Sequence, residues 1–116
     1  AKTSMAAPAC SPSAVSVGAV YDSNMGAIGW SGCSDSSTAA DKVTCFSNST
    51  SFLDLLAPGA LITAGGHTMG GTSQASPHVA GAMALVAAAF PDATPDEIEA
   101  RLKSTGVNVT DSRNSV

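Results

Sequence analysis

The sequence predicts an α/β fold with a largely parallel sheet. Three segments carry this prediction: small apolar residues run continuously over 14–20, an uncharged apolar run covers 74–90, and a strongly capped helix begins at Pro95. A strand whose residues are nearly all apolar is typical of a parallel sheet covered on both faces, and the later segments have the length and end signals of helices. The 116 residues suffice for one small domain and are too few for two.

The first predicted strand, residues 14–20 (AVSVGAV), precedes a long polar tract. Residues 21–51 are rich in Ser, Thr, Asp and Gly around Trp30. Such a composition favours turns and loops, so we expect a surface excursion with room for one short strand.

The three cysteines form no CxxC pair, which disfavours a zinc site. Cys33 and Cys45 flank a polar loop, and a disulfide between them would stabilise the fold by about 3 kcal/mol. Cys10 would then pair with a thiol outside this sequence. Three reduced thiols in a cytosolic protein are the alternative.

Two further short strands are predicted. Residues 52–56 form an apolar run that a Pro-Gly turn at 58–59 closes, and residues 60–64 follow as the next strand. Glycines at 65, 66, 70 and 71 bracket residues 67–69, a spacing that suits a tight hairpin or a close approach of backbone to ligand.

The run over residues 74–90 predicts a helix that is buried all round, because apolar side chains cover every side of its helical wheel. A membrane span is disfavoured, since Pro77 and His78 leave an apolar stretch shorter than the ~20 residues that a span needs.

A second helix is predicted from Pro95 to about Ser104. Thr94 suits its N-cap, Pro95 its first position, and Glu97 completes a capping box. Gly106 lies just beyond the expected end, and the chain then continues without another predicted element.

Composition excludes several classes of protein. The net charge of −4 and the pI near 4.7 give no electrostatic reason to bind nucleic acid or an anionic membrane. With 44% apolar residues, disorder is not indicated, yet 21 of these residues are Ala. Small side chains bury little area, so the core should be thin, as in a piece of a larger domain.

One serine is placed for chemistry. Ser73 lies where a Gly-rich turn meets the start of the apolar helix. Free N–H groups at a helix start carry partial positive charge, so the Ser73 N–H could stabilise an oxyanion on a carbonyl that its own Oγ attacks. An ordinary N-cap serine is the alternative.

Residues 71–81, GTSQASPHVAG, closely resemble the active-site serine signature of the subtilisin-like serine proteases, the subtilases. Further resemblance lies in residues 12–20, 46–48, 54–59 and 91–102. It implies a three-layer αβα fold with a mostly parallel sheet, here incomplete, and an exported serine endopeptidase. Ser73 would be the nucleophile, and Thr72 would add its hydroxyl to the oxyanion hole formed with the Ser73 N–H.

The resemblance also implies a substrate cleft. Ala6, Ala7 and Ala9 would lie along the wall of an apolar pocket, and Met69, Gly70 and Gly71 would line the cleft. No cofactor is required by this chemistry.

Asp54 aligns with a weak cation site of some subtilases, to which carbonyls near Ala9 and Ala14 would contribute, so the complete domain could hold a structural calcium ion. A strand-end Asp that makes turn hydrogen bonds is the favoured alternative.

The base that a serine nucleophile needs is missing. His78 lies about 140° round the helix from Ser73 and cannot face it. His67 belongs to the expected hairpin, which lines the cleft in the family. Because the subtilase triad runs Asp, His, Ser along the chain, both partners should precede Ala1.

Residues 1–116 are therefore expected to be the C-terminal part of a secreted catalytic domain, inactive alone. Its partners would be a polypeptide substrate and the missing N-terminal part of the domain, with no nucleic acid and no membrane. The alternative is a non-catalytic, protease-derived binding or scaffold module.

Overall fold

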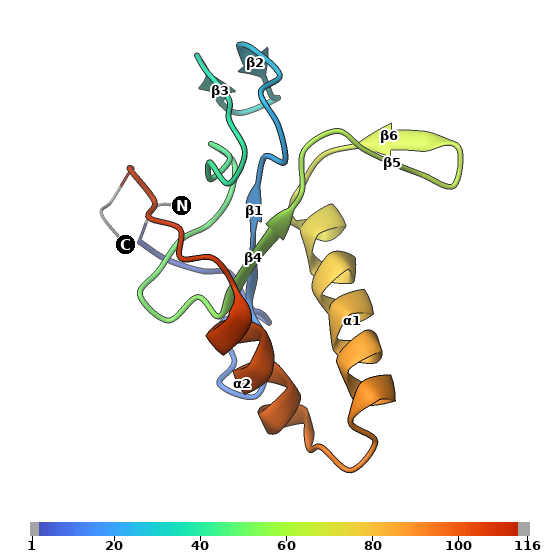
Figure 1. The fold of residues 1–116 in the computed structure, drawn as a ribbon. Helices are drawn as coiled ribbons and strands as arrows, with labels where there is room; N and C mark the ends of the chain where they lie inside the picture. The colour runs from blue at the N-terminus through green and yellow to red at the C-terminus, as the bar shows by residue number, and fades with distance from the viewer. Residues whose placement is uncertain (1–2, 114–116) are drawn as a thin grey trace.

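A computed structural model describes residues 3–113 of the chain (Figure 1). Its elements, in chain order, are β1 (Val17–Val20), β2 (Ile28–Gly29), β3 (Ser34–Asp35), β4 (Leu55–Pro58), β5 (Ile62–Ala64), β6 (His67–Met69), α1 (Thr72–Ala89) and α2 (Pro95–Thr105).

The central unit is a pair of parallel strands with a helix packed on it. β1 and β4 run side by side in register from Val17 opposite Leu55 to Val20 opposite Pro58. The boundaries differ from the prediction, because β1 begins three residues later than expected and β4 lies at Leu55–Pro58 rather than at 52–56. Pro58, which was expected in a turn, is therefore the last residue of β4. Within residues 3–113 this parallel sheet has two strands.

The core between α1 and the sheet is built from small side chains. Ala19, Ala57, Ala75 and Val79 are buried together. Their size lets the helix approach the strands closely, which explains why an alanine-rich sequence forms this layer.

The opposite face of the sheet contacts the segment that leads into β4. A methyl group on Gly18 would lie 2.7 Å from Leu56 Cδ2 and 3.0 Å from both Leu53 Cδ2 and Ser47 Oγ. Ser47 is fully buried, and its Oγ accepts a hydrogen bond from the Ala19 N–H at 3.0 Å. Two leucine side chains and the buried hydroxyl of Ser47 thus cover the sheet at Gly18.

Two antiparallel hairpins lie beyond the parallel pair. β2 pairs with β3, and β5 pairs with β6. The polar tract therefore contains two short strands where the sequence indicated room for one. The structure joins Cys33 to Cys45 by a disulfide, and Cys10 is a free, exposed thiol.

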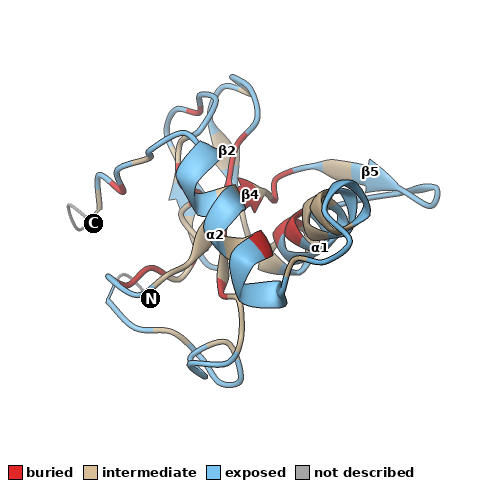
Figure 2. Cartoon of the chain, turned by 60° about the horizontal axis from the view of Figure 1, so that its bottom comes forward, coloured by how far each residue is buried: buried red, intermediate tan, exposed pale blue. Residues whose placement is uncertain are grey.

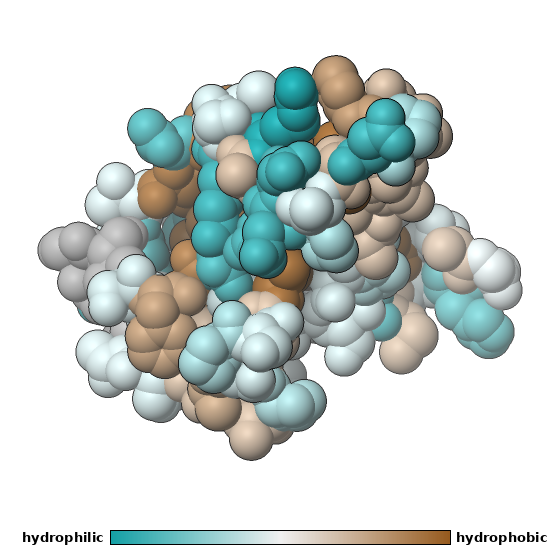
Figure 3. All heavy atoms as spheres, turned by 90° about the horizontal axis from the view of Figure 1, so that it is seen from below, coloured by the Kyte–Doolittle hydropathy of each residue, from teal (hydrophilic) through white to brown (hydrophobic). Residues whose placement is uncertain are grey.

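α1 differs from the helix expected from its sequence. Only Ala75 and Val79 are buried, and Leu85 is 75% exposed. In Figure 2 most of α1 is accordingly coloured as intermediate or exposed. The prediction that this helix is buried all round is wrong for this chain, because the two-stranded sheet and α2 cover only part of its surface. When the molecule is seen from below, hydrophobic residues are exposed on its surface beside a band of hydrophilic residues (Figure 3).

α2 begins as its sequence predicts. The Thr94 hydroxyl accepts from the Glu97 N–H, and the Glu97 carboxylate accepts from the Thr94 N–H, so both bonds of the capping box are present. Ile98 is buried, and α2 packs against α1. Neither helix among the described residues has the length and apolarity needed to cross a membrane.

Candidate active site

The candidate nucleophile lies at the start of α1. Gly71 is the N-cap residue, with φ 153° and ψ 167°, a conformation that is essentially restricted to glycine. Its carbonyl accepts the N–H of Gln74 at 3.0 Å. The N–H groups of Thr72 and Ser73 precede this bond, so they have no acceptor within the helix.

The end of β4 fixes this helix start. The Gly71 N–H donates to the Gly59 carbonyl at 2.7 Å. Gly59 has no room for a side chain, since its Cβ would lie 2.7 Å from Ala19 Cβ and 2.8 Å from the Gly71 oxygen. The end of the sheet at Gly59 and the start of the helix at Gly71 are therefore in direct backbone contact. Gly71 immediately precedes Thr72 and Ser73 in the chain.

Ser73 is exposed and opens onto a hollow of about 540 Å³. The residues that line it are Ala9, Val15, Val17, Thr72, Ser73, Ser76 and Pro77. The walls are apolar apart from the three hydroxyl side chains. This arrangement can place an apolar group beside a hydroxyl nucleophile and a free helix-terminal N–H.

The structure brings only some of the predicted substrate-binding residues to this hollow. Ala9 lines it together with Thr72 and Ser73. Ala6 and Ala7 are exposed on the preceding segment. The roles of these three alanines stay predictions.

The remaining predicted cleft residues belong to the segment between β6 and α1. Met69 ends β6 and is 57% exposed, and Gly70 and Gly71 connect it to the helix. They are adjacent to Ser73 in the chain but do not line its hollow. Their contact with substrate also stays a prediction.

Neither histidine is placed beside the serine as a base. The His78 ring is 2.7 Å from the Gln74 carbonyl through Nδ1, so this nitrogen is the donor of a bond within the helix. His67 lies in β6, opposite Ala64 of β5, and is exposed. Within the described residues, His78 is thus bonded to its own helix, and His67 belongs to the β5–β6 hairpin.

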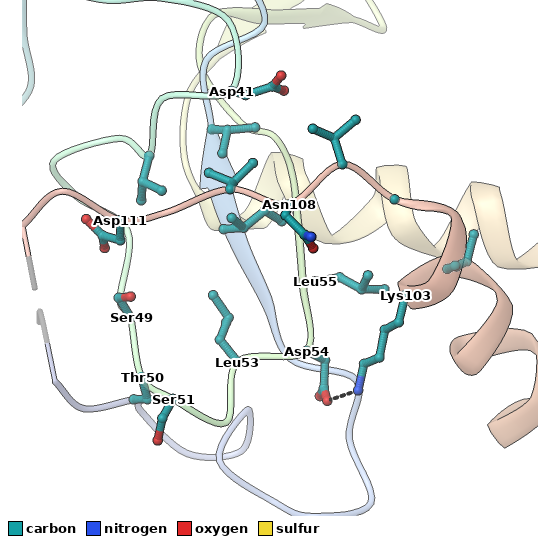
Figure 4. Close-up of a pocket in the computed structure, with 17 residues that line it drawn as sticks. Asp41, Ser49, Thr50, Ser51, Leu53, Asp54, Leu55, Lys103, Asn108 and Asp111 are labelled. Carbon is teal, nitrogen blue, oxygen red and sulfur yellow. Dashed lines mark hydrogen bonds and ion pairs between the residues drawn. The ribbon is translucent and has the colours of Figure 1, made fainter. Parts of the chain in front are cut away.

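Asp54 is engaged by donors of the protein itself (Figure 4). Its Oδ2 accepts from the Ser16 N–H at 2.8 Å and the Ser16 Oγ at 2.9 Å, and its Oδ1 lies 2.7 Å from the Lys103 ammonium. Burial alone would raise the pKa of Asp54, but the hydrogen bonds from Lys103 and Ser16 outweigh burial and lower it.

These contacts do not fit the weak cation site that the sequence suggested. Ammonium and N–H groups already satisfy both carboxylate oxygens of Asp54. Within residues 3–113, no cluster of three or more His, Cys, Asp or Glu side chains is arranged to hold a metal ion. Asp54 precedes β4, but its side chain bonds to the distant Ser16 and Lys103 rather than within a turn, as the favoured alternative expected.

Sequence reasoning missed the anchor of the C-terminal segment, which it left without structure. Arg113 Nη1 donates to the carbonyls of Thr44, Cys45 and Ser47 at 3.0–3.1 Å. Its guanidinium also pairs with the buried carboxylate of Asp111. No local sequence pattern predicts these bonds, because the acceptor carbonyls lie in a loop more than 60 residues earlier in the chain.

Comparison with known proteins finds a family match over nearly the whole chain. The Subtilase family profile matches residues 1–115. Subtilisin E of Bacillus subtilis (strain 168) is 41% identical over 103 residues, which are 84% of this chain and 23% of that protein. Alkaline serine exoprotease A of Vibrio alginolyticus is 43% identical over 89 residues, which are 70% of this chain and 16% of that protein.

A solved structure agrees. The crystal structure of a cold adapted subtilisin-like serine proteinase superposes with a TM-score of 0.70 at 33% identity, over 95% of this chain and 37% of that one. These comparisons confirm the predicted resemblance and the partial, subtilisin-like α/β fold. The chain spans less than two fifths of the length of each of these relatives. From its sequence and its fold alike, the chain belongs to the subtilase family.

Proposed function

We propose that this chain supplies the nucleophile of a serine endopeptidase when it is combined with the N-terminal part of a subtilase domain. The observation that carries the proposal is the position of Ser73, which is exposed at the second residue of α1 and opens onto an apolar hollow. Family membership makes peptide-bond hydrolysis the reaction to test first.

In the proposed reaction, Ser73 Oγ attacks the carbonyl carbon of a polypeptide while a histidine of the N-terminal part accepts its proton. The C–N bond breaks, the amine leaves with that proton, and water then hydrolyses the ester on Ser73. The Ser73 N–H, with Thr72 beside it, stabilises the negative charge that develops on the carbonyl oxygen.

Among residues 3–113 both histidines are placed elsewhere, in the helix and in the hairpin, so we expect the chain alone to be inactive. A helix-terminal N–H without a base leaves most of the rate enhancement unrealised. The extracellular serine proteinase of Thermus sp. (strain Rt41A) is among the relatives, and export with a polypeptide substrate is proposed here by analogy.

A fluorophosphonate probe tests the proposal. The purified chain should label slowly, and the chain joined to its N-terminal part should label rapidly at Ser73 and cleave a chromogenic peptide. Ser73→Ala should abolish labelling, and Ser76→Ala, which alters a neighbouring hydroxyl in the same hollow, should not. A joined domain that takes no label would instead support the non-catalytic binding module.

A further inference from the structure

The Trp30 side chain lies against Gly70, and Gly70 is three residues before Ser73, the candidate nucleophile. A methyl group on Gly70 would lie 2.5 Å from Trp30 Cη2 and closer still to Cζ3. The six-membered ring of the indole therefore occupies the space in which a side chain at position 70 would lie. Gly70 leads directly to Gly71, whose backbone caps α1.

The indole is held from several sides. Its Nε1 donates to the Tyr21 hydroxyl at 2.9 Å, and its ring meets Phe46 edge to face with centroids 4.8 Å apart. The backbone N–H of Trp30 donates to the Cys33 carbonyl at 2.7 Å. The first two contacts hold the indole ring, and the third holds the backbone that carries it.

The partners of Trp30 are themselves fixed. The fully buried Tyr21 donates its hydroxyl to Asp35 Oδ2 at 2.7 Å, and the same oxygen accepts the Cys45 N–H at 2.9 Å. Cys45 is joined to Cys33 by the disulfide. These bonds within the polar tract hold Tyr21, which accepts the indole N–H. Strands β2 and β3 of this tract lie beyond the end of β4, near which α1 begins (Figure 1).

We propose that Trp30 is a positioning residue, which presses on Gly70 and so fixes the Gly70–Gly71 backbone that orients Thr72 and Ser73. The inference rests on the proposed function for its catalytic consequence, but its structural content does not. The polar tract, which its composition predicts to be a surface excursion, then supports the candidate active site.

Amide hydrogen exchange on the 116-residue chain tests this support. Trp30→Phe keeps an aromatic ring but removes the Nε1 donor and the atoms that reach Gly70. We expect exchange of the Gly71 and Gln74 N–H groups, bonded to Gly59 and Gly71, to become at least tenfold faster. Exchange of the Ile98 N–H in α2, which measures general loosening, should stay within twofold.

Phe90→Ala is the matched control, because it removes a half-exposed aromatic ring at the other end of α1. It should leave exchange at Gly71 and Gln74 unchanged. Equal acceleration at Gly71, Gln74 and Ile98 in Trp30→Phe would show a general loss of stability and overturn the proposal.

A double-mutant cycle tests the contact itself. Gly70→Ala should shift the unfolding equilibrium at least tenfold more in the parent chain than in Trp30→Ala, where the ring no longer occupies the space. Equal shifts in the two backgrounds would overturn the inference.

Fluorophosphonate labelling of the joined domain separates this inference from the proposed function. Trp30→Phe should lower the labelling rate of Ser73 at least tenfold without changing the melting temperature of the domain by more than a degree or two. An unchanged rate would overturn the positioning role. A parent domain that never labels would overturn the proposed function, and the exchange rates and the cycle would still decide whether Trp30 fixes Gly70.

Discussion

The ammonium group of Lys103 lies 2.7 Å from Asp54 Oδ1 and joins α2 to the residue that precedes β4. Lys103 also lies 3.0 Å from Glu99, one helical turn earlier. Because Asp54 Oδ2 accepts from Ser16, which precedes β1, one carboxylate links three segments of the chain. The Lys103 ammonium thus contacts the carboxylate that the family resemblance connected with a weak cation site.

Lys103→Met should lower the free energy of unfolding by about 1 kcal/mol or less, because the ammonium is partly exposed and screened by water. In the parent chain, millimolar calcium or a chelator should leave the melting temperature unchanged. Thermal denaturation with and without each additive checks both statements, and a calcium-dependent melting temperature in the parent chain would contradict the role given to Lys103.

Acid should weaken the anchor of the C-terminal segment. Hydrogen bonds from Arg113 lower the pKa of Asp111 to about 2, against burial, which acts in the other direction. A depressed folded-state pKa stabilises the protein above the ordinary value near 4, and this contribution, about 2 kcal/mol, is lost as the pH falls from about 4 to 2.

Asp111→Asn should therefore flatten the pH dependence of the unfolding free energy between pH 4 and 2, as measured by urea denaturation. The matched control is Asp92→Asn, at an exposed carboxylate between the two helices, which should keep the slope of the parent chain. The same slope in Asp111→Asn as in the parent would contradict this assignment.

High pH should destabilise the fold through ionisation of Tyr21, the single tyrosine of the chain. Burial raises its pKa to about 12, the hydrogen bond to Asp35 adds to this effect, and the bond from Trp30 opposes it. A raised folded-state pKa stabilises the protein below pH 10, and about 2 to 3 kcal/mol of stability should disappear between pH 10 and 12. Ultraviolet absorbance of tyrosinate at rising pH measures the titration, and a midpoint near 10 in the folded chain would contradict it.

Two glycine substitutions should have opposite effects. Gly59→Ala should cost about 3 kcal/mol or more, because the added methyl meets Ala19 and the Gly71 carbonyl, and neither can move without moving the backbone. Gly81→Ala should stabilise the chain by about 0.5–1 kcal/mol, since Gly81 lies inside α1 with nothing within 4 Å of its added Cβ. Denaturant unfolding of both variants is the measurement, and equal costs would contradict the packing at Gly59.

Peroxide should leave the peptidase activity of the joined domain unchanged. Position 74 carries Gln, which has no sulfur, whereas the thioether of a Met beside the nucleophile would be open to oxidation. In the joined domain, Gln74→Met should lose most of its peptidase activity after peroxide, while the parent keeps it. Equal inactivation of the two proteins would rule out this role for Gln74.

The sequence by itself determined the elements that depend on near neighbours. The capping box of α2 depends on hydrogen bonds between Thr94 and Glu97, which are three residues apart. The β5–β6 hairpin depends on the backbone freedom of the glycines between its strands. Both features therefore follow from residues that are close in the sequence. The motif around Ser73 likewise identified the family and the start of α1.

Only the tertiary structure decided what lies against these elements. Trp30 meets Gly70, Lys103 meets Asp54, and Arg113 meets three carbonyls of a loop far away in the chain. It also decided that α1 buries only Ala75 and Val79 fully and leaves Leu85 exposed in this chain. Contacts and burial of this kind depend on which segments fold next to each other, and no periodicity or spacing within one segment contains that information.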